Sequence, residues 1–250
     1  MRLNLYVHYD SVSNHVMTRG INFIPADFEQ KFIPNNLILE TAVPGFGRFD
    51  SATNFYIVRG KQDVLEFLLH CQKEKLRIPD WIDFESMTLM HQLSPNEIAE
   101  ILYLFHANQT LRSAFFYKLQ NNYAYLTLPN GLIKTYYRQV KHFAPRFQRV
   151  MLEQMQGLLN EGKSLFFGKR QSAKMMPKDL VDRLIPLFAR GLKIDITQAY
   201  QEGQEWVIPL FVIEDELTLL TVNQARSAQE GLLVYNIDQQ TWELVLQHNG

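Results

Sequence analysis

Cysteine is nearly absent from this sequence of 250 residues. Its single cysteine, Cys71, cannot form a disulfide within the chain or supply a cysteine cluster for zinc or iron. Such sparse usage is typical of proteins in a reducing compartment. A chain of this length can bury enough apolar surface to fold without a metal or a disulfide.

Long hydrophobic runs are also lacking. The longest, Trp206 to Ile213, has eight residues, whereas about 20 are needed to cross a bilayer. The first residues alternate apolar and polar side chains, which is typical of a strand and not of the apolar core of a secretion signal. We therefore expect a soluble cytoplasmic protein that does not associate with a membrane.

Most catalytic and cofactor motifs are missing, including G-x-S-x-G, H-E-x-x-H, G-x-G-x-x-G and the EF-hand loop. Gly157 to Ser164 does fit G-x-x-x-x-G-K-[ST] and is similar to the phosphate-binding loop of P-loop NTPases, with Lys163 and Ser164 in the phosphate-contacting positions. That loop requires a preceding strand, but the pattern before Gly157 is helical. The sequence favours a non-enzymatic protein without a cofactor; an atypical nucleotide-binding hydrolase is the alternative.

One group of residues near the start of the chain could ligate a metal. His8, Asp10 and His15 are suitable residue types, yet strand spacing places only His8 and Asp10 on one face. A solvated strand end explains them more simply, so no metal site is expected.

Charge is close to balanced overall, at a net −1, but it is segregated along the chain. The net charge is −4 over residues 1–100, +10 over 101–178 and −7 over 179–250. No acidic residue lies between Glu100 and Glu153, while that interval holds seven Lys or Arg and eleven Phe or Tyr. A basic, aromatic middle indicates either an anionic ligand or a segment that docks on its own acidic neighbours.

Hydrophobic patterns predict an α+β protein, because strands and helices are segregated rather than alternating. Beyond a first strand and a loop-rich stretch to about residue 52, we expect about four helices, at 62–76, 94–107, 145–160 and 177–190. Ser94 and Glu97 form a capping box for the second, and Asp80 is expected to cap a helix. A mostly antiparallel C-terminal sheet is predicted from strands at 192–200, 206–213, 217–222, 232–237 and 242–247. The predicted domains, with an approximate boundary, are an N-terminal α+β region at 1–110 and a region at 111–250 that holds the central meander, helices and C-terminal strands. A single domain would also fit the sequence.

A three-stranded antiparallel meander is expected in the basic middle. Its strands are Ala114–Gln120, Tyr123–Pro129 and Leu132–Arg138, and its turns are Asn121-Asn122 and Asn130-Gly131, which tolerate positive φ. If both turns contain two residues, counting places Tyr125 opposite Tyr136.

One face of this meander would combine tyrosine rings with basic side chains and no carboxylate. Such a face could stack bases and neutralise phosphates, or bind an acidic protein surface. Alternatively, another part of the chain covers this face, and the protein has a purely structural or protein-interaction role. The candidate binding residues, including two on a basic connection further along the chain, are Lys118, Tyr123, Tyr125, Lys134, Tyr136, Arg138, Lys169 and Arg170.

Overall fold

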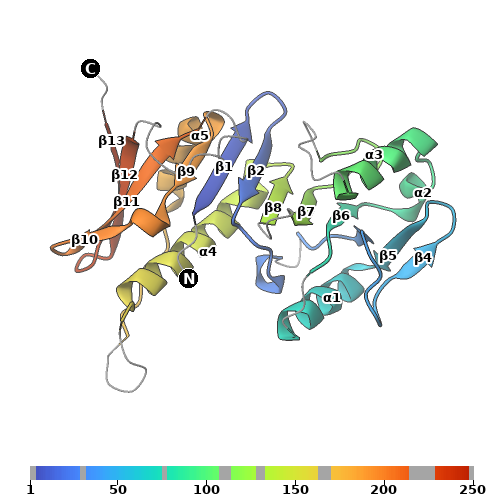
Figure 1. The fold of residues 1–250 in the computed structure, drawn as a ribbon, viewed down its shortest axis with the longest axis horizontal. Coiled ribbons are helices and arrows are strands. Elements are labelled where there is room, and N and C mark those ends of the chain that lie inside the picture. Colours follow the sequence, from blue (N-terminus) through green and yellow to red (C-terminus); the bar gives the residue numbers. More distant parts are fainter. Residues whose placement is uncertain are drawn as a thin grey trace. The chain divides into compact units, whose positions relative to one another are not determined.

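A computed structural model describes residues 4–28, 32–74, 78–106, 114–127, 133–162, 170–213 and 229–247. The chain divides into two compact units (Figure 1). Unit 1 combines residues 1–21 with 143–250, and unit 2 comprises 22–142. This division differs from the expected one near residue 110, because β1 (Leu5–Asp10) pairs with β9 (Leu192–Ile194) and so places the start of the chain in unit 1.

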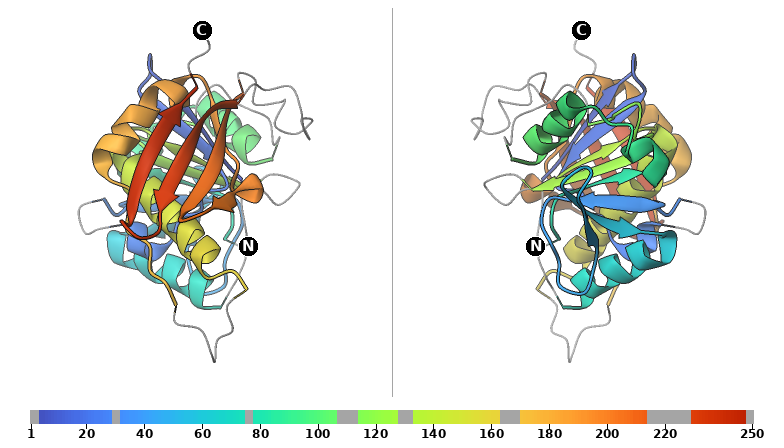
Figure 2. Two further views of the ribbon diagram at one scale, coloured as in Figure 1. Left: turned by 90° about the vertical axis from the view of Figure 1, so that its left-hand side faces the viewer. Right: turned by 90° about the vertical axis from the view of Figure 1, so that its right-hand side faces the viewer.

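The predicted α+β class is confirmed: within the described residues there are thirteen strands and five α-helices. In unit 1 the strand order is β13-β12-β11-β9-β1-β2, with β10 paired to β11, and each of these pairs is antiparallel. Besides β1 and β9, its strands are β2 (His15–Arg19), β10 (Tyr200–Glu202), β11 (Glu205–Val212), β12 (Gln229–Asn236) and β13 (Thr241–Leu246). The orange and red strands at the front of Figure 2 (left) are β11, β12 and β13.

Alternation of side chains builds the core of unit 1. Ile208 of β11 lies opposite Leu233 of β12, which lies opposite Leu244 of β13, so the three share one face and are buried. Helix α5 (Lys178–Ala189) packs against β1, β9 and β13. Phe188 of α5 meets two rings of α4 (Val140–Leu159), Phe143 and Phe147, at 5.6 and 5.4 Å between centroids.

Gly191 makes the tight connection between α5 and β9. Its φ of +79° is a left-handed conformation that glycine adopts without strain. The Ile213 N–H donates to the Gly191 carbonyl, and the Tyr6 hydroxyl donates to the Ile213 carbonyl. A Cβ on Gly191 would overlap the Ile213 carbonyl oxygen and lie 2.6 Å from the Tyr6 hydroxyl oxygen.

Gly191→Ala should therefore lower the free energy of unfolding by about 2 kcal/mol or more, since it adds a steric clash to backbone strain. Gly203→Ala is the matched control: Gly203 also has a positive φ, but nothing lies within 4 Å of its Cβ position, and strain alone should cost about 1 kcal/mol. Urea unfolding of both variants measures the difference, and equal losses would contradict the clash.

Unit 2 has the strand order β8-β7-β6-β3-β5-β4, again antiparallel at each pair. Its core is rich in aromatic rings: Phe23 lies 5.2–5.6 Å from the rings of Trp81, Tyr123 and Tyr137, between centroids. The elements are β3 (Asn36–Leu39), β4 (Arg48–Asp50), β5 (Phe55–Arg59), α1 (Lys61–Lys73), β6 (Trp81–Phe84), α2 (Met87–Met90), α3 (Pro95–His106), β7 (Tyr123–Thr127) and β8 (Ile133–Tyr137).

The four predicted helices are present as α1, α3, α4 and α5, but the predicted start of the third at residue 145 is wrong: α4 begins at Val140, and Pro145 lies inside it. Strands 206–213, 232–237 and 242–247 correspond to β11, β12 and β13, whereas 192–200 divides into β9, a 3-10 turn and β10. The strand expected at 217–222 lies outside the described residues. Within the described part of the chain, no helix is long and apolar enough to cross a membrane.

The first strand of the predicted meander is wrong. Residues 117–120 form a turn instead, in which Gln120 has a φ of +50°. The Asn121 side chain accepts from the Phe116 N–H and donates to the Ala114 carbonyl. These backbone groups therefore bond to a side chain rather than to a neighbouring strand.

The expected loop-rich stretch to residue 52 was also incorrect, because it contains β2, β3 and β4. Asp80 does not cap a helix: it precedes β6, and its carboxylate accepts from the Thr127 N–H at 2.7 Å. The short strands β3 and β6 are buried along their whole length, so they lack the alternation by which half-buried strands are recognised.

Candidate functional site

The β7–β8 hairpin carries four of the predicted binding residues, but its register differs from the predicted one by one residue. Tyr125 lies opposite Thr135, and Lys134 lies opposite Leu126. Five residues, 128–132, separate the two strands where the prediction assumed a two-residue turn. A one-residue shift sends side chains to opposite faces, so Tyr123 and Tyr125 lie on one face of the hairpin and Lys134 and Tyr136 on the other.

These four side chains are buried, with at most 5% of Tyr123, Tyr125, Lys134 or Tyr136 exposed. The Tyr125 ring stacks on Trp81, with centroids 6.0 Å apart and planes 8° apart. The Lys134 ammonium lies 5.2 Å from the Tyr136 ring centroid. The predicted outward face of rings and bases is therefore wrong, because its members point to two faces and neither exposes them.

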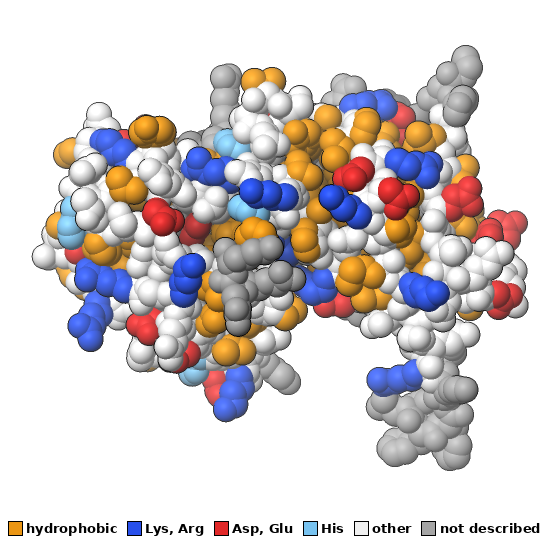
Figure 3. Space-filling view, turned by 180° about the vertical axis from the view of Figure 1, so that it is seen from behind, with side chains coloured by type: hydrophobic (Ala, Val, Ile, Leu, Met, Phe, Trp, Pro, Cys, Tyr) orange, Lys and Arg blue, Asp and Glu red, His pale blue; other side chains and the backbone are white. Residues whose placement is uncertain are grey.

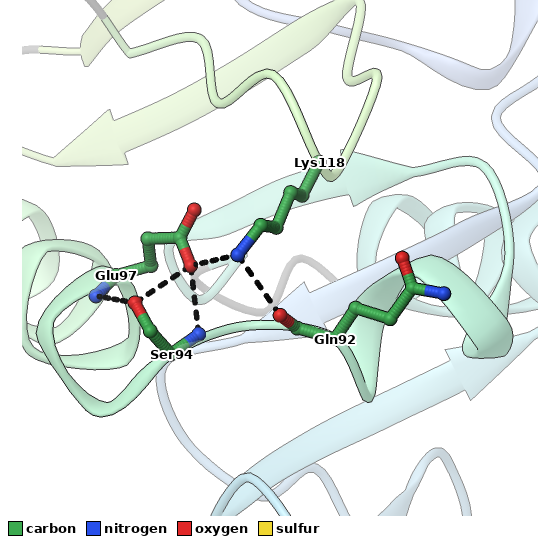
Figure 4. Close-up of polar contacts among 4 residues, drawn as sticks. All are labelled: Gln92, Ser94, Glu97 and Lys118. Atoms are coloured by element: carbon green, nitrogen blue, oxygen red, sulfur yellow. Dashed lines mark hydrogen bonds and ion pairs between the residues drawn. The ribbon is translucent and has the colours of Figure 1, made fainter.

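Lys118 belongs to a polar cluster at the start of α3 (Figure 4). Its ammonium donates to the Glu97 carboxylate at 2.7 Å and to the Gln92 carbonyl at 3.0 Å. The Ser94 N–H and hydroxyl donate to the same Glu97 oxygen, each at 2.7 Å, which confirms the capping box. Hydrogen bonds from Lys118 and Ser94 lower the pKa of Glu97 to about 2, and Lys118 forms its ion pair within the protein.

Arg138 is also used internally. Its guanidinium donates through Nε to the Asn121 carbonyl and through Nη2 to the Asn121 side-chain oxygen, and it lies 5.2 Å from the Phe115 ring centroid. Asn121 is fully buried and holds residues 114–116 through its own side chain. Arg138 thus stabilises residues 114–120, the segment predicted to be a strand, through its hydrogen bonds to Asn121.

Asn121→Ala should lower the free energy of unfolding by about 2–3 kcal/mol, because the buried Ala114 carbonyl and the partly buried Phe116 N–H lose their partner. Asn122→Ala is the matched control, since only the backbone of Asn122 bonds to Asp83 and its side chain is partly exposed; it should cost under about 0.5 kcal/mol. Denaturant unfolding measures both, and similar losses would show that the side-chain bonds of Asn121 contribute little.

Asp83 is a buried aspartate in β6 that sequence reasoning did not select as a site residue. One of its carboxylate oxygens accepts from the N–H groups of Asn122 at 2.9 Å and Tyr123 at 2.6 Å. Burial raises its pKa to about 7, although the two N–H donors and Arg138 oppose that rise. The available signal was an acidic residue inside the apolar run Trp81–Phe84.

The remaining two candidates precede α5. Lys169 lies outside the described residues, whereas Arg170 is described and exposed. The three tyrosines among the eight predicted binding residues are all buried, so none lies on the surface beside a basic side chain.

Basic and acidic side chains are interspersed over the face of the molecule drawn in Figure 3.

The phosphate-loop match falls in a helical context, as the sequence indicated. Gly157 lies within α4, and Gly162 follows the helix with a φ of +73°. Lys163 and Ser164 lie outside the described residues. A helix in place of the preceding strand does not aim backbone N–H groups at a phosphate in the P-loop manner.

The residues considered for a metal form an ordinary hairpin. Asp10 pairs with His15 across β1 and β2, and its carboxylate accepts from Val12 and Ser13 in the turn. Within the described ranges, no group of three or more His, Cys, Asp or Glu side chains could hold a metal ion.

No known protein family, curated protein or solved structure matches this chain.

Proposed function

We propose that this chain is a non-enzymatic protein that binds an acidic protein surface through residues 170–178, called here the basic segment. The observation that carries the proposal is that its three basic side chains are exposed and without an ion pair in the described part of the chain. Arg170, Lys174 and Lys178 are exposed, and none forms an ion pair within the described residues. The first acidic side chain after them is Asp179.

The basic segment has no regular secondary structure before α5, yet its backbone is fixed by side chains of unit 1. The Lys174 N–H donates to the Tyr235 hydroxyl at 3.0 Å, and the Trp242 indole donates to the Lys174 carbonyl at 2.9 Å. Gln148 donates to the Met176 carbonyl at 2.6 Å. A backbone held in this way loses little conformational freedom on binding, which favours affinity.

Composition favours a protein partner over a nucleic acid. Sequence-tolerant binding of single strands uses aromatic rings on which bases stack, and residues 170–178 contain none. The exposed apolar side chain beside Lys174 is Met175, which is 52% exposed. Methionine adapts to varied apolar contacts and is common on protein-binding surfaces.

The test measures binding of poly-glutamate at several salt concentrations, with a single-stranded oligonucleotide as the second probe. We expect poly-glutamate to bind with an affinity that falls as salt rises, and Lys174→Glu with Lys178→Glu to weaken it at least about tenfold. The matched control reverses two exposed lysines of α1, Lys61→Glu with Lys73→Glu, and should change affinity under about twofold.

Three results would contradict the proposal. One is the absence of poly-glutamate binding by the unmodified protein, and another is equal loss in both double variants. Tighter binding of the oligonucleotide, lost in the same double variant, would reassign the basic segment to nucleic acid.

A further inference from the structure

The buried carboxylate of Asp83 lies where one segment of unit 2 is attached to the sheet. Its oxygen binds the backbone of Asn122 and Tyr123, at the start of β7. Next to these bonds, the Glu85 N–H donates to the Leu119 carbonyl at 2.9 Å. The end of β6 therefore holds the chain on both sides of Asn121.

Residues 114–122 have no strand pairing of their own within the described residues. Besides the bonds to β6, they are held by Arg138 at Asn121 and by Lys118 at Glu97. The segment also presents Tyr117, whose side chain is 91% exposed. Ala114 and Leu119 of the segment are buried, but a segment without strand hydrogen bonds can open locally without unfolding of the sheet.

Several charged or titratable groups face Asp83 or its contacts. Arg138, directly after β8, is the charge that acts on the carboxylate. Opposite Asp83 on β3 is the apolar Leu37. On the β7 side His142 contacts the Tyr123 ring, with centroids 5.5 Å apart. Glu85, two residues along, is exposed, and Lys118 is paired with Glu97.

We propose that Asp83 is a pH-sensitive switch that holds residues 114–122 closed when its side chain is neutral and releases them when it is ionised. In the open state the carboxylate is hydrated, so that the charge is no longer buried. A side chain that is buried in the closed state and hydrated in the open one binds its proton more tightly when closed.

The sign of the pH dependence follows from the pKa of about 7 in the closed state, against an ordinary value of 3.8. Protonation of Asp83 stabilises the closed state fully below pH 3.8, and this stabilisation is lost as the pH rises through 7. Asp83→Asn keeps an oxygen for both N–H donors but cannot ionise, so it should remove the dependence.

Hydrogen exchange of residues 114–123, followed by mass spectrometry and corrected for intrinsic rates, tests the switch. Between pH 6 and 8.5 the opening equilibrium of the unmodified protein should increase roughly tenfold, with most of the increase below about pH 7.5. In Asp83→Asn the increase should stay below about threefold. Peptides from β9 and β11 serve as the internal control and should not follow this pH dependence.

His142 is the competing titratable group, so His142→Gln is the second variant and should keep the roughly tenfold increase. Loss of the pH dependence in His142→Gln, with retention in Asp83→Asn, would overturn the proposal. If Asp83→Asn does not fold, the profile of the unmodified protein decides: a rise that approaches tenfold per pH unit below 7 and levels off above it supports the switch, and a flat profile contradicts it.

Discussion

A buried carboxylate must be compensated, and the organisation of unit 2 depends on how this is done for Asp83. Its compensation comes from the backbone N–H groups that begin β7 and from the guanidinium that follows β8. Both lie in the part of the chain that is rich in basic and aromatic residues. Among the side chains that suggested an external anionic ligand, Lys118 and Arg138 therefore donate to internal acceptors.

Internal contacts account for three of the bases in that basic middle. Lys118 neutralises the carboxylate that caps α3, and Arg138 donates to Asn121. Lys134 is buried beside the Tyr136 ring. Segregated charge in a sequence can thus reflect contacts within the fold, and the bases that stay exposed and without an ion pair are the better guide to a partner. In the described part of the middle these include the three bases of residues 170–178.

Much of the fold could be predicted from the sequence, since helical stripes and the capping box at Ser94 are local signals. The strands β11, β12 and β13 also have clear apolar runs. Short buried strands such as β3 and β6 carry no periodic signal. The site was harder to predict: strand-like composition at 114–120 was overridden by side-chain bonds of Asn121, and the β7–β8 register depended on a turn length that composition does not determine.

In this fold Lys134 is enclosed, whereas the bases of the basic segment are accessible. Amine-selective labelling of the folded protein, quantified lysine by lysine by mass spectrometry, tests this most directly. Because Lys134 is 3% exposed, its labelling should be at least about tenfold slower than that of Lys174 and Lys178. Labelling of Lys134 as fast as that of Lys174 would contradict the account.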